Sequence, residues 1–325
     1  MRKIFVDKIL EDKVSKFSDN LFNSRDFQKP IDKLKLLKKG KKFSSIAESK
    51  YIDKIINEYK DILKANPNKI NDLCNEFDLI IKPEKIKPDF WKAIVECLRY
   101  EDLRNHEYLE FANELQYKTC FYCNTQLCVI IPVEYYKIKK LKGQIKSRKA
   151  TFELDHIKAK SNYPFLATSF FNLIPSCSIC NKAKTNNDIG FTFFEEDPNK
   201  LELIEFKLLK KSEQIYWKTN SKSDLELDYN LIGYNKDDYN NTFKIKEIYD
   251  TQKDIIEELI YLKKIYSPSY KKQLTNILKS EKLFPDEALI DRLIIGNYSK
   301  PEECHKRPFS KFTQDIARQL KLIKK

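Results

Sequence analysis

The sequence predicts an α+β protein in which a small, cysteine-rich middle module lies between two mainly helical regions. Between about residues 45 and 115, apolar residues recur at intervals of three and four, which is the helical period. Between about 116 and 200 this period fades, and apolar β-formers, turn residues and paired cysteines appear. We therefore expect three parts: a helical region over 1–115, the middle module over 116–200, and a C-terminal α+β or helical region over 201–325.

Length and charge bound the function. A chain of 325 residues is long enough to bury a full core and to divide into two or three domains. It carries 61 Lys and Arg against 48 Asp and Glu, which gives a formal net charge of +13. Excess positive charge favours polyanionic partners, with nucleic acid as the leading candidate. A Lys-, Ile- and Asn-rich chain also follows from genome composition, so charge alone identifies no chemistry.

The N-terminal stretch MRKIFVDKILEDKVSKF does not read as a secretory signal, because charges interrupt its apolar residues. No stretch reaches the ~20 apolar residues that span a membrane. We therefore expect a cytoplasmic protein without a membrane partner. In a reducing compartment, its eight cysteines are expected to be free or metal-bound rather than bridged.

The flanking regions contain several stretches with a clear period. Three predict helices in the N-terminal region: IAESKYIDKIINEYKDILK, DFWKAIVECLRYEDL and HEYLEFANEL. In the C-terminal region, LELIEFKLL and QIYWKT have the pattern of strands. The stretch TFKIKEIYDTQKDIIEELIYLKKIY predicts one long amphipathic helix. The following SPSY is expected to end it, because a helix seldom continues through proline.

Two cysteine pairs of identical spacing lie in the middle module: CFYC, with Cys120 and Cys123, and CSIC, with Cys177 and Cys180. A C-x-x-C knuckle directs two thiolates into one tetrahedral site, and two knuckles supply all four ligands of a structural zinc ion. Unliganded or redox-active thiols are the alternative, which the missing thioredoxin-like context disfavours. The other cysteines are expected to be small buried apolar side chains: Cys74, Cys97, Cys128 and Cys304.

Between the knuckles, the sequence predicts a strand over LCVIIPVEYY, a basic loop and a strand over ATFELDHI. FFNLIPSCSICNKAK then predicts a short strand that turns into a helix at the second pair. Asp155 and His156 end the strand that precedes it, and Asn181 opens the helix. So small a unit cannot fold on apolar burial alone, which gives a bound metal its structural reason.

In these residues the chain resembles the HNH nucleases, the ββα-metal family, in their zinc-bound form. The resemblance covers about residues 116–190: the two knuckles, Asp-His, NLIP and CN-x-x-K follow the family's order. It implies a zinc-stapled ββα-metal module and a nuclease that cuts DNA, and it leaves RNA open as a substrate. Asn181 stands where the motif often has its last histidine. Many members carry Asn there, so this departure leaves the metal preference open.

The residues themselves suit phosphodiester hydrolysis. A neutral imidazole takes a proton from water at physiological pH, so His156 is a candidate general base. Asp155 and the amide oxygen of Asn181 are hard ligands suited to Mg²⁺ or Mn²⁺, which stabilises charge on the scissile phosphate. By resemblance, Asn172 ties the loop between strand and helix and orients His156. Each residue also has a structural alternative: His156 as a buried, hydrogen-bonded core residue, Asn172 as a turn former and Asn181 as a helix cap.

Residues 137–149, KIKKLKGQIKSRK, carry seven basic groups and no acidic one. A solvated hairpin loop is the plain reading. Because the stretch lies within the nuclease-like module, we expect an arm that contacts phosphates without reading bases. The residues expected to bind nucleic acid are Lys139, Lys140, Lys142 and Lys146 on this arm, and Lys182 and Lys184 beside the metal site.

A second class of function stays open at this stage. A catalytically inactive, zinc-stabilised nucleic-acid-binding module needs neither Asp155 nor His156 nor Asn181, and their presence argues against it. The long flanking regions and the closing RPFSKFTQDIARQLK resemble HNH subunits that accompany ATPases in bacterial anti-phage systems of the Septu and retron-associated kinds. This resemblance implies an ATPase partner and a role in antiviral defence. His106 and His305 are expected to be surface or packing residues.

Overall fold

The computed structural model describes residues 1–325 apart from 24–28, 138–139, 188, 281–286 and 325. By its internal contacts the chain divides into two compact units. The first unit contains Met1–Lys3, Tyr117–Leu127 and Asn199–Lys325, and the second contains Ile4–Gln116 and Cys128–Pro198. The predicted regions 1–115, 116–200 and 201–325 divide the chain differently and stay a proposal about its organisation. Among the described helices, none combines the length and apolar character that crossing a membrane requires.

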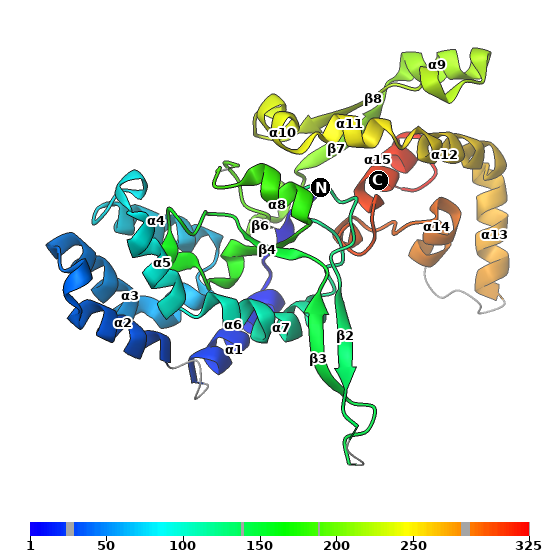
Figure 1. Cartoon of the computed structure of the whole chain (residues 1–325). Coiled ribbons are helices and arrows are strands. Elements are labelled where there is room, and N and C mark those ends of the chain that lie inside the picture. The colour runs from blue at the N-terminus through cyan, green and yellow to red at the C-terminus, as the bar shows by residue number, and fades with distance from the viewer. Residues whose placement is uncertain (24–28, 138–139, 188, 281–286, 325) are drawn as a thin grey trace. The chain divides into compact units, whose positions relative to one another are not determined.

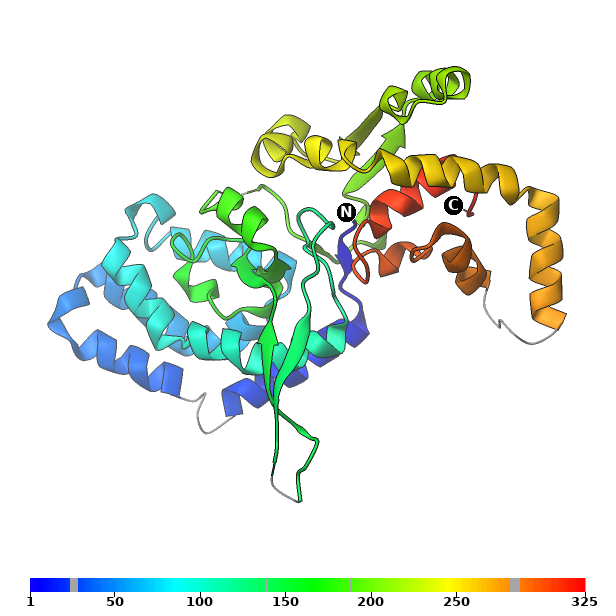
Figure 2. The ribbon, with the colours of Figure 1, turned by 45° about the vertical axis from the view of Figure 1, so that its right-hand side comes forward.

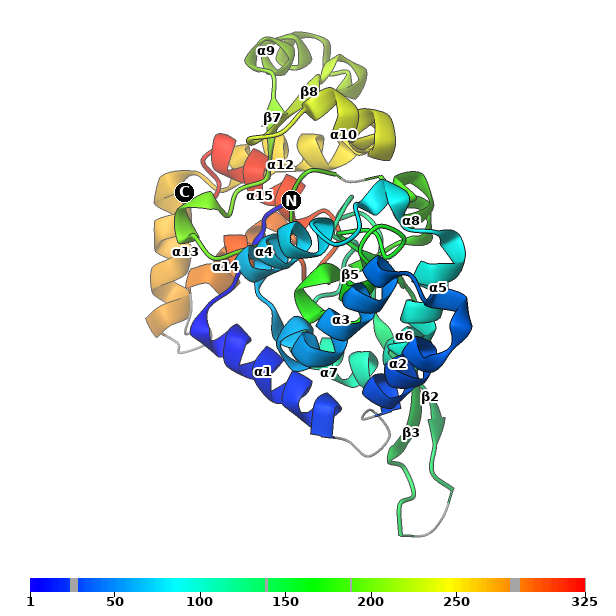
Figure 3. The same cartoon turned by 90° about the vertical axis from the view of Figure 1, so that its left-hand side faces the viewer.

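The N-terminal part of the second unit is helical, as the sequence predicts. Its helices are α1 (Lys8–Asn23), α2 (Lys29–Lys39), α3 (Ile46–Lys64), α4 (Pro67–Asp78), α5 (Pro88–Cys97), α6 (Tyr100–Asn105) and α7 (Glu107–Leu115). α3 begins with a capping box, in which Ser45 and Glu48 each satisfy a backbone N–H of the other. It lies against α1 and α2 (Figure 3).

The predicted helix over DFWKAIVECLRYEDL is wrong in one respect, because the stretch forms two helices. α5 ends at Cys97, and Arg99 takes the left-handed conformation, with φ of 57°, before α6 begins. A non-glycine residue at this φ breaks the helical ladder and turns the chain. As a result α6 takes its own direction, and its Tyr100 hydroxyl donates a hydrogen bond to the carbonyl oxygen of Leu154 at 2.8 Å.

The middle of the chain forms a long hairpin and then a shorter one. β2 (Ile130–Tyr135) pairs antiparallel with β3 (Ile145–Ala150), and this hairpin extends away from the helices of its unit (Figures 1 and 2). β4 (Glu153–His156) pairs antiparallel with β5 (Leu173–Ser176), and α8 (Ser178–Lys184) follows. The strand expected over ATFELDHI is interrupted: Ala150 ends β3, Thr151 continues the β2–β3 pairing through its hydrogen bonds with Val129, and β4 begins only at Glu153.

Aromatic packing fixes the loop between β4 and β5 against the helices. The ring of Phe165 stacks on that of Phe77 in α4, with centroids 3.8 Å apart. Phe170 meets Phe111 of α7 edge to face at 4.7 Å. The hydroxyls of Tyr59 and Thr168 are 3.0 Å apart in a buried hydrogen bond. The loop is thus held by the helical part of its own unit, and it positions the site described below.

The first unit combines a two-stranded sheet with helices. β7 (Ile204–Leu208) pairs antiparallel with β8 (Leu227–Leu231), which confirms the strand predicted over LELIEFKLL. The helices are α9 (Lys210–Thr219), α10 (Lys236–Phe243), α11 (Ile245–Asp250), α12 (Lys253–Ile265), α13 (Pro268–Ser280), α14 (Glu287–Ile295) and α15 (Ser310–Gln319).

Two predictions in the first unit are wrong. QIYWKT lies in α9 rather than in a strand, because Ser212 and Tyr216, one helical turn apart, are both buried on one face. The long helix predicted over residues 242–266 is divided among α10, α11 and α12. Lys244 adopts the left-handed conformation, with φ of 52°, and separates the first two. The predicted stop at SPSY is confirmed, and Pro268 begins α13.

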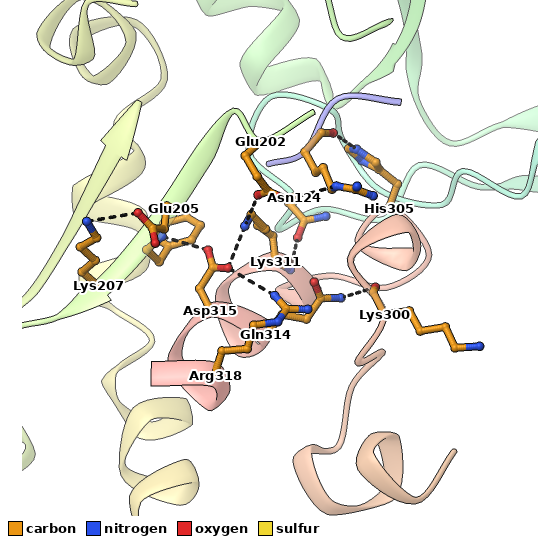
Figure 4. Close-up of polar contacts among 12 residues, drawn as sticks. Asn124, Glu202, Glu205, Lys207, Lys300, His305, Lys311, Gln314, Asp315 and Arg318 are labelled. Carbon is orange, nitrogen blue, oxygen red and sulfur yellow. Dashed lines mark hydrogen bonds and ion pairs between the residues drawn. The ribbon is translucent and has the colours of Figure 1, made fainter. Parts of the chain in front are cut away.

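α15 is the buried axis of the first unit, and its residues Ser310–Ala317 are all buried. Asp315 accepts a hydrogen bond from the backbone N–H of Phe206 in β7 at 2.9 Å (Figure 4). Lys311 donates to Glu202 at 2.8 Å and to Asp315 at 2.7 Å. Burial alone would lower the pKa of Lys311, but these two carboxylates outweigh it and the pKa is raised.

Candidate active site

The local fold brings the predicted catalytic residues to one edge of a small sheet. His156 in β4 faces Leu173 in β5, and Asp155 faces Ile174. The chain then turns at Cys177, the N-cap of α8, and α8 lies against β4 (Figure 1). The short strand and the helix predicted at the second cysteine pair are confirmed. This order places a side chain of α8 opposite the side chains of β4.

Asp155, His156 and Asn181 all line one cavity of about 340 Å³ in the second unit. Its other lining residues come from α6, β4, the following loop and the end of α8: Tyr100, Arg104, Glu153, Leu154, Ala159, Lys160, Thr185 and Asn186. Polar and charged groups therefore dominate the cavity. Three of the four predicted catalytic residues line this cavity, and Asn172 is not among its lining residues.

The His156 side chain is buried and firmly oriented. Its Nε2 lies 3.0 Å from the carbonyl oxygen of Ala167, and its ring centroid lies 4.7 Å from that of Tyr100. A carbonyl oxygen only accepts hydrogen bonds, so Nε2 carries the proton of the neutral imidazole and Nδ1 carries the lone pair. Burial, together with the charges of Lys160 and Lys184, lowers the pKa of His156 to about 3. The imidazole is therefore neutral at physiological pH.

Asp155 shares its buried position with a lysine from α8. The Lys184 side chain is fully buried, and its Nζ lies 3.4 Å from Asp155 Oδ2 and 2.8 Å from the backbone oxygen of His156. A phosphate contact by Lys184, as predicted from the sequence, requires this pair to open and stays a prediction. Lys182 is exposed on the same helix. Its position is compatible with the phosphate contact predicted for it.

Asn181 lies inside α8 and does not cap it, so the structural alternative of a capping asparagine is wrong. Its Nδ2 donates a short hydrogen bond to the Glu153 carboxylate. The amide oxygen Oδ1 is thereby left as the acceptor end of the side chain. Glu153 lies two residues before Asp155 on β4. Alternation along a strand puts residues i and i+2 on one face, and this signal in ELDH would have identified Glu153 from the sequence.

Asn172 holds the loop that leads to the histidine's partner. Its Oδ1 accepts a hydrogen bond from the Lys158 N–H at 2.7 Å, and its Nδ2 donates to the oxygens of Lys158 and Leu166 at 3.1 and 3.3 Å. The next residue along the loop, Ala167, supplies the carbonyl that fixes His156. Asn172 thus ties the loop backbone next to Ala167, and the orienting role predicted for it stays a prediction.

Other lining residues carry no motif that identifies them in the sequence. Tyr100 and Arg104 belong to α6, about fifty residues before the strand that they meet, and only the fold brings them there. The Lys160 ammonium lies 4.5 Å from the Tyr100 ring centroid, and burial lowers the pKa of Lys160. A partly desolvated cation beside Asp155 and His156 adds positive charge where an anionic substrate would bind.

The four predicted zinc ligands are close together. The Sγ atoms of Cys120, Cys123, Cys177 and Cys180 all lie within 4.8 Å of one another. Tetrahedral zinc with Zn–S bonds of about 2.3 Å places its sulfurs about 3.8 Å apart, so the cluster is of the right size. In the first knuckle, Asn124 takes a left-handed φ of 56°, and the Thr125 hydroxyl donates to Cys123 Sγ at 3.2 Å.

The remaining cysteines and histidines confirm their expected structural roles. Cys74, Cys97, Cys128 and Cys304 are buried. His305 is buried, and its Nε2 lies 2.7 Å from the backbone oxygen of Arg2 (Figure 4). Its ring stacks on that of Phe121, with centroids 4.4 Å apart. His106 is exposed between α6 and α7.

The basic arm is the β2–β3 hairpin and its turn. Lys140 and Lys142 are exposed in the turn, and Lys139 lies outside the described residues. Lys146 is in β3, where its Nζ pairs with Glu134 of β2 at 3.0 Å. The basic stretch is therefore part turn and part strand, and one of its predicted phosphate contacts already has a carboxylate partner.

Comparison with known proteins supports the resemblance in part. A family model described as HNH endonuclease matches residues 141–187. This segment contains β3, β4, β5 and α8, with Asp155, His156, Asn172, Asn181 and the second cysteine pair. The first pair precedes it. No curated protein and no solved structure matches the chain. The HNH match suggests a nuclease, and it covers neither of the two flanking regions.

Proposed function

We propose that the chain is a metal-dependent HNH endonuclease that hydrolyses phosphodiester bonds in DNA. The observation that carries this proposal is the single cavity lined by Asp155, His156 and Asn181. We interpret β4, β5 and α8 as the family's ββα-metal unit, because β4 supplies Asp155 and His156, β5 pairs with β4, and α8 supplies Asn181. A buried binding module without catalysis has no need of this combination.

His156 serves as the general base in this proposal. Its Nε2 is engaged with Ala167, so Nδ1 is the atom that takes a proton from the attacking water. The low pKa keeps Nδ1 unprotonated, although it also makes the free imidazole a weak base. A bound phosphate brings negative charge next to the ring and raises this pKa toward the range in which proton transfer is efficient. Asn172 secures the loop on which this orientation depends.

Asp155 and the Oδ1 of Asn181 are the proposed ligands of Mg²⁺ or Mn²⁺. Both are hard oxygen donors, and Glu153 holds the amide by its Nδ2 so that the oxygen end is available. When bound, such an ion stabilises charge on the scissile phosphate and on the departing 3′ oxygen. In the absence of the ion, the positive charge of Lys184 lies beside Asp155 and partly neutralises its carboxylate.

We further propose that Cys120, Cys123, Cys177 and Cys180 hold one structural zinc ion. Their proximity and their donor chemistry support it. Purified protein is expected to contain about one equivalent of zinc, and Cys177→Ser should lose the metal and the local fold. Cys97→Ser is the matched control, because Cys97 is buried outside the cluster and should leave the zinc content unchanged. Well-folded protein without zinc by elemental analysis would contradict the proposal.

The proposed partner is DNA, and its phosphates are expected to meet exposed basic groups. Lys140, Lys142 and Lys182 are exposed, and Lys146 is partly engaged with Glu134. These contacts position the backbone and carry no base specificity. The net charge of +13 adds long-range attraction for any nucleic acid, so RNA belongs among the substrates to be tested.

A role as the effector of an anti-phage system, together with an ATPase, is a further proposal from the sequence. The residues that suggested it, RPFSKFTQDIARQLK, include α15, whose residues Ser310–Ala317 are buried in their own unit. These side chains are occupied within the fold, so a partner would be recognised by other surfaces. An ATPase gene next to this one, and copurification of its product, would support the association.

The proposed function is tested by incubating purified protein with plasmid DNA, linear DNA and RNA. Each substrate is offered with Mg²⁺, with Mn²⁺ or with EDTA. Cleavage of DNA that depends on the divalent ion is the expected result, with zinc content measured in parallel so that loss of structural metal is recognised. Tight binding without any cleavage would favour the alternative of an inactive nucleic-acid-binding module.

A further inference from the structure

A second cleft adjoins the catalytic cavity within the second unit. It has a volume of about 340 Å³ and lies between α6, α7 and the base of the β2–β3 hairpin. It is lined by Arg104, Asn105, Tyr108, Leu109, Val133, Arg148, Lys149, Ala150, Phe152 and Leu154. Arg104 and Leu154 line both cavities. The two cavities are therefore neighbours that share the side chains of Arg104 and Leu154.

The rim of the cleft is basic. Arg104, Arg148 and Lys149 line it, and none of its described lining residues is a carboxylate. The carboxylates that approach the two arginines from outside are Glu101, 3.6 Å from Arg104, and Glu110, 3.8 Å from Arg148. These glutamates are 67% and 77% exposed, so the pairs are weak surface contacts. A phosphate, which binds guanidinium through two parallel hydrogen bonds, can displace them.

The remainder of the cleft is apolar and aromatic. Leu109, Val133 and Phe152 contribute its surface, and the Val133 side chain, on β2, is 48% exposed. A paired duplex would present only sugars and phosphates here, because its bases remain stacked inside the helix. An unpaired nucleotide presents the face of its base, and aromatic and apolar side chains bind such faces without regard to sequence. The cleft thus matches a nucleotide whose base has left the stack.

We propose that this cleft binds one unpaired nucleotide that flanks the scissile phosphate, with its phosphate at Arg104 and Arg148 and its base against Phe152 and Val133. The inference rests on the proposed function for the position of the scissile phosphate. It assigns the substrate class: the enzyme acts on single-stranded DNA or on duplex with unpaired nucleotides beside the cut. Intact duplex is the poorer substrate, because a base must first leave the stack at a cost in free energy.

The test measures binding rather than cleavage, with the parent protein in buffer without added divalent cation. The probe is a labelled single-stranded DNA of about 12 nucleotides, a length within the site sizes of single-strand-binding folds, and the same sequence as a duplex. An abasic nucleotide is moved through every position of the single strand. Single-strand binding should exceed duplex binding, and one or two adjacent abasic positions should weaken it on the order of tenfold.

Two double variants locate the effect. Arg148→Ala with Lys149→Ala removes the basic rim and should weaken binding of the single strand on the order of tenfold, with a smaller abasic effect. Lys210→Ala with Lys211→Ala removes the same charge from exposed positions of the other unit and should change the affinity less than about twofold. Equal losses in both variants, a flat abasic scan or a preference for duplex would overturn the proposal.

The results separate this inference from the proposed function. Metal-dependent cleavage together with a flat abasic scan would leave the nuclease and remove the subsite. An abasic effect that depends on Arg148 and Lys149, without cleavage of any substrate, would leave the subsite and replace the nuclease with a nucleic-acid-binding module. Neither cleavage nor an abasic effect would remove both.

Discussion

Two buried lysine–aspartate pairs, one in each unit, differ in the length of the ion pair. In the first unit, Lys311 Nζ lies 2.7 Å from Asp315 and 2.8 Å from Glu202, and Asp315 also accepts the Phe206 N–H (Figure 4). In the second, Lys184 Nζ lies 3.4 Å from Asp155. The side chains are similarly buried, with exposed fractions of 4% and 6% in the first pair and 0% and 9% in the second.

The two pairs also differ in their surroundings. Burial of charge is costly, and only short, fully hydrogen-bonded geometry repays it. The network around Lys311 meets that requirement and joins α15 to β7. Asp155 has a longer ion pair and lines a cavity, so its carboxylate is placed where a cation or a phosphate-bound ion can compete with Lys184. Similar residue types with similar burial therefore occur in different surroundings.

The largest expected effect tests whether His156 takes part in catalysis or is only a hydrogen-bonded packing residue. His156→Ala should lower DNA cleavage by about 10²- to 10⁴-fold, because it removes the proposed general base. DNA binding should persist, since the basic arm and the cysteine cluster are untouched. Initial rates of cleavage at saturating Mg²⁺, on whichever of the single-stranded and plasmid DNA substrates the parent cuts faster, measure the effect. A rate equal to the parent's would make His156 a packing residue and end the nuclease assignment.

A matched series distinguishes the base from the metal ligands. Asp155→Ala and Asn181→Ala should also lose cleavage, but by weakening the ion, so a higher concentration of Mg²⁺ or Mn²⁺ should restore part of it. The same increase should not restore His156→Ala. Recovery of all three variants, or of none, would show that these residues do not divide the work in this way.

The second prediction removes each buried lysine in turn. Lys311→Met leaves Glu202 and Asp315 buried without their cation and should lower the free energy of unfolding by about 3–5 kcal/mol. Lys184→Met leaves one carboxylate that faces a cavity, so its loss should be smaller. Added Mg²⁺ should recover part of the loss in Lys184→Met only. Urea denaturation with and without Mg²⁺ measures the free energy of unfolding of both variants. Equal losses in the two variants, with no effect of Mg²⁺, would contradict the proposed difference between the two pairs.

Local chemistry explains which parts of the fold were predictable. The helix over 46–64 follows from its period and from the capping box of Ser45 and Glu48, and the structure has it with the same bounds. The helix at the second cysteine pair likewise follows from the sequence around Cys177. Two of the departures occur where a single backbone conformation interrupts a helix: the left-handed Arg99 and Lys244 divide stretches whose periodicity is continuous. No residue type in those stretches announces the break.

The candidate site divides in the same way. Asp155, His156 and Asn181 are found from a short motif, because strand and helix positions near in sequence meet in space. Glu153 was also available from the alternation of the strand and was missed. Arg104 could not be predicted from the sequence, because only the position of α6 in the fold brings it to the cavity. Long-range packing, which no local pattern encodes, supplies the residues of α6 that line the cavity.

The third prediction uses pH. The pKa of His156 is about 3 in the folded protein and near its ordinary 6.5 when unfolded, so between these values the unfolded chain alone takes up the proton. This contribution to stability is fully present above about pH 7 and declines as the pH falls. It amounts to a loss of about 2 kcal/mol at pH 5 relative to pH 7.

His156→Gln isolates this contribution, because glutamine does not titrate and still offers a donor to Ala167. Without added divalent cation, the parent should lose about 2 kcal/mol more stability than the variant between pH 7 and pH 5 in urea denaturation. Zinc loss and other titrations affect both proteins alike and cancel. An identical pH dependence would show that the histidine is accessible to protons in the folded state and that the cavity is not a desolvated site.

The smallest expected effect concerns exposed charges, which contrast with both buried pairs. Lys140→Ala with Lys142→Ala should weaken DNA binding on all sequences alike and flatten the slope of log affinity against log salt by about 2, because each lost phosphate contact retains roughly one counterion. Lys146→Ala should change the slope less than either turn lysine, since Lys146 already pairs with Glu134. Binding titrations between low and moderate salt measure these slopes. The contrary result is that Lys146→Ala flattens the slope as much as the change of one turn lysine. In that case phosphate displaces Glu134 from Lys146 as easily as it displaces water from a turn lysine. The arm would then bind DNA along its strands as well as at its turn.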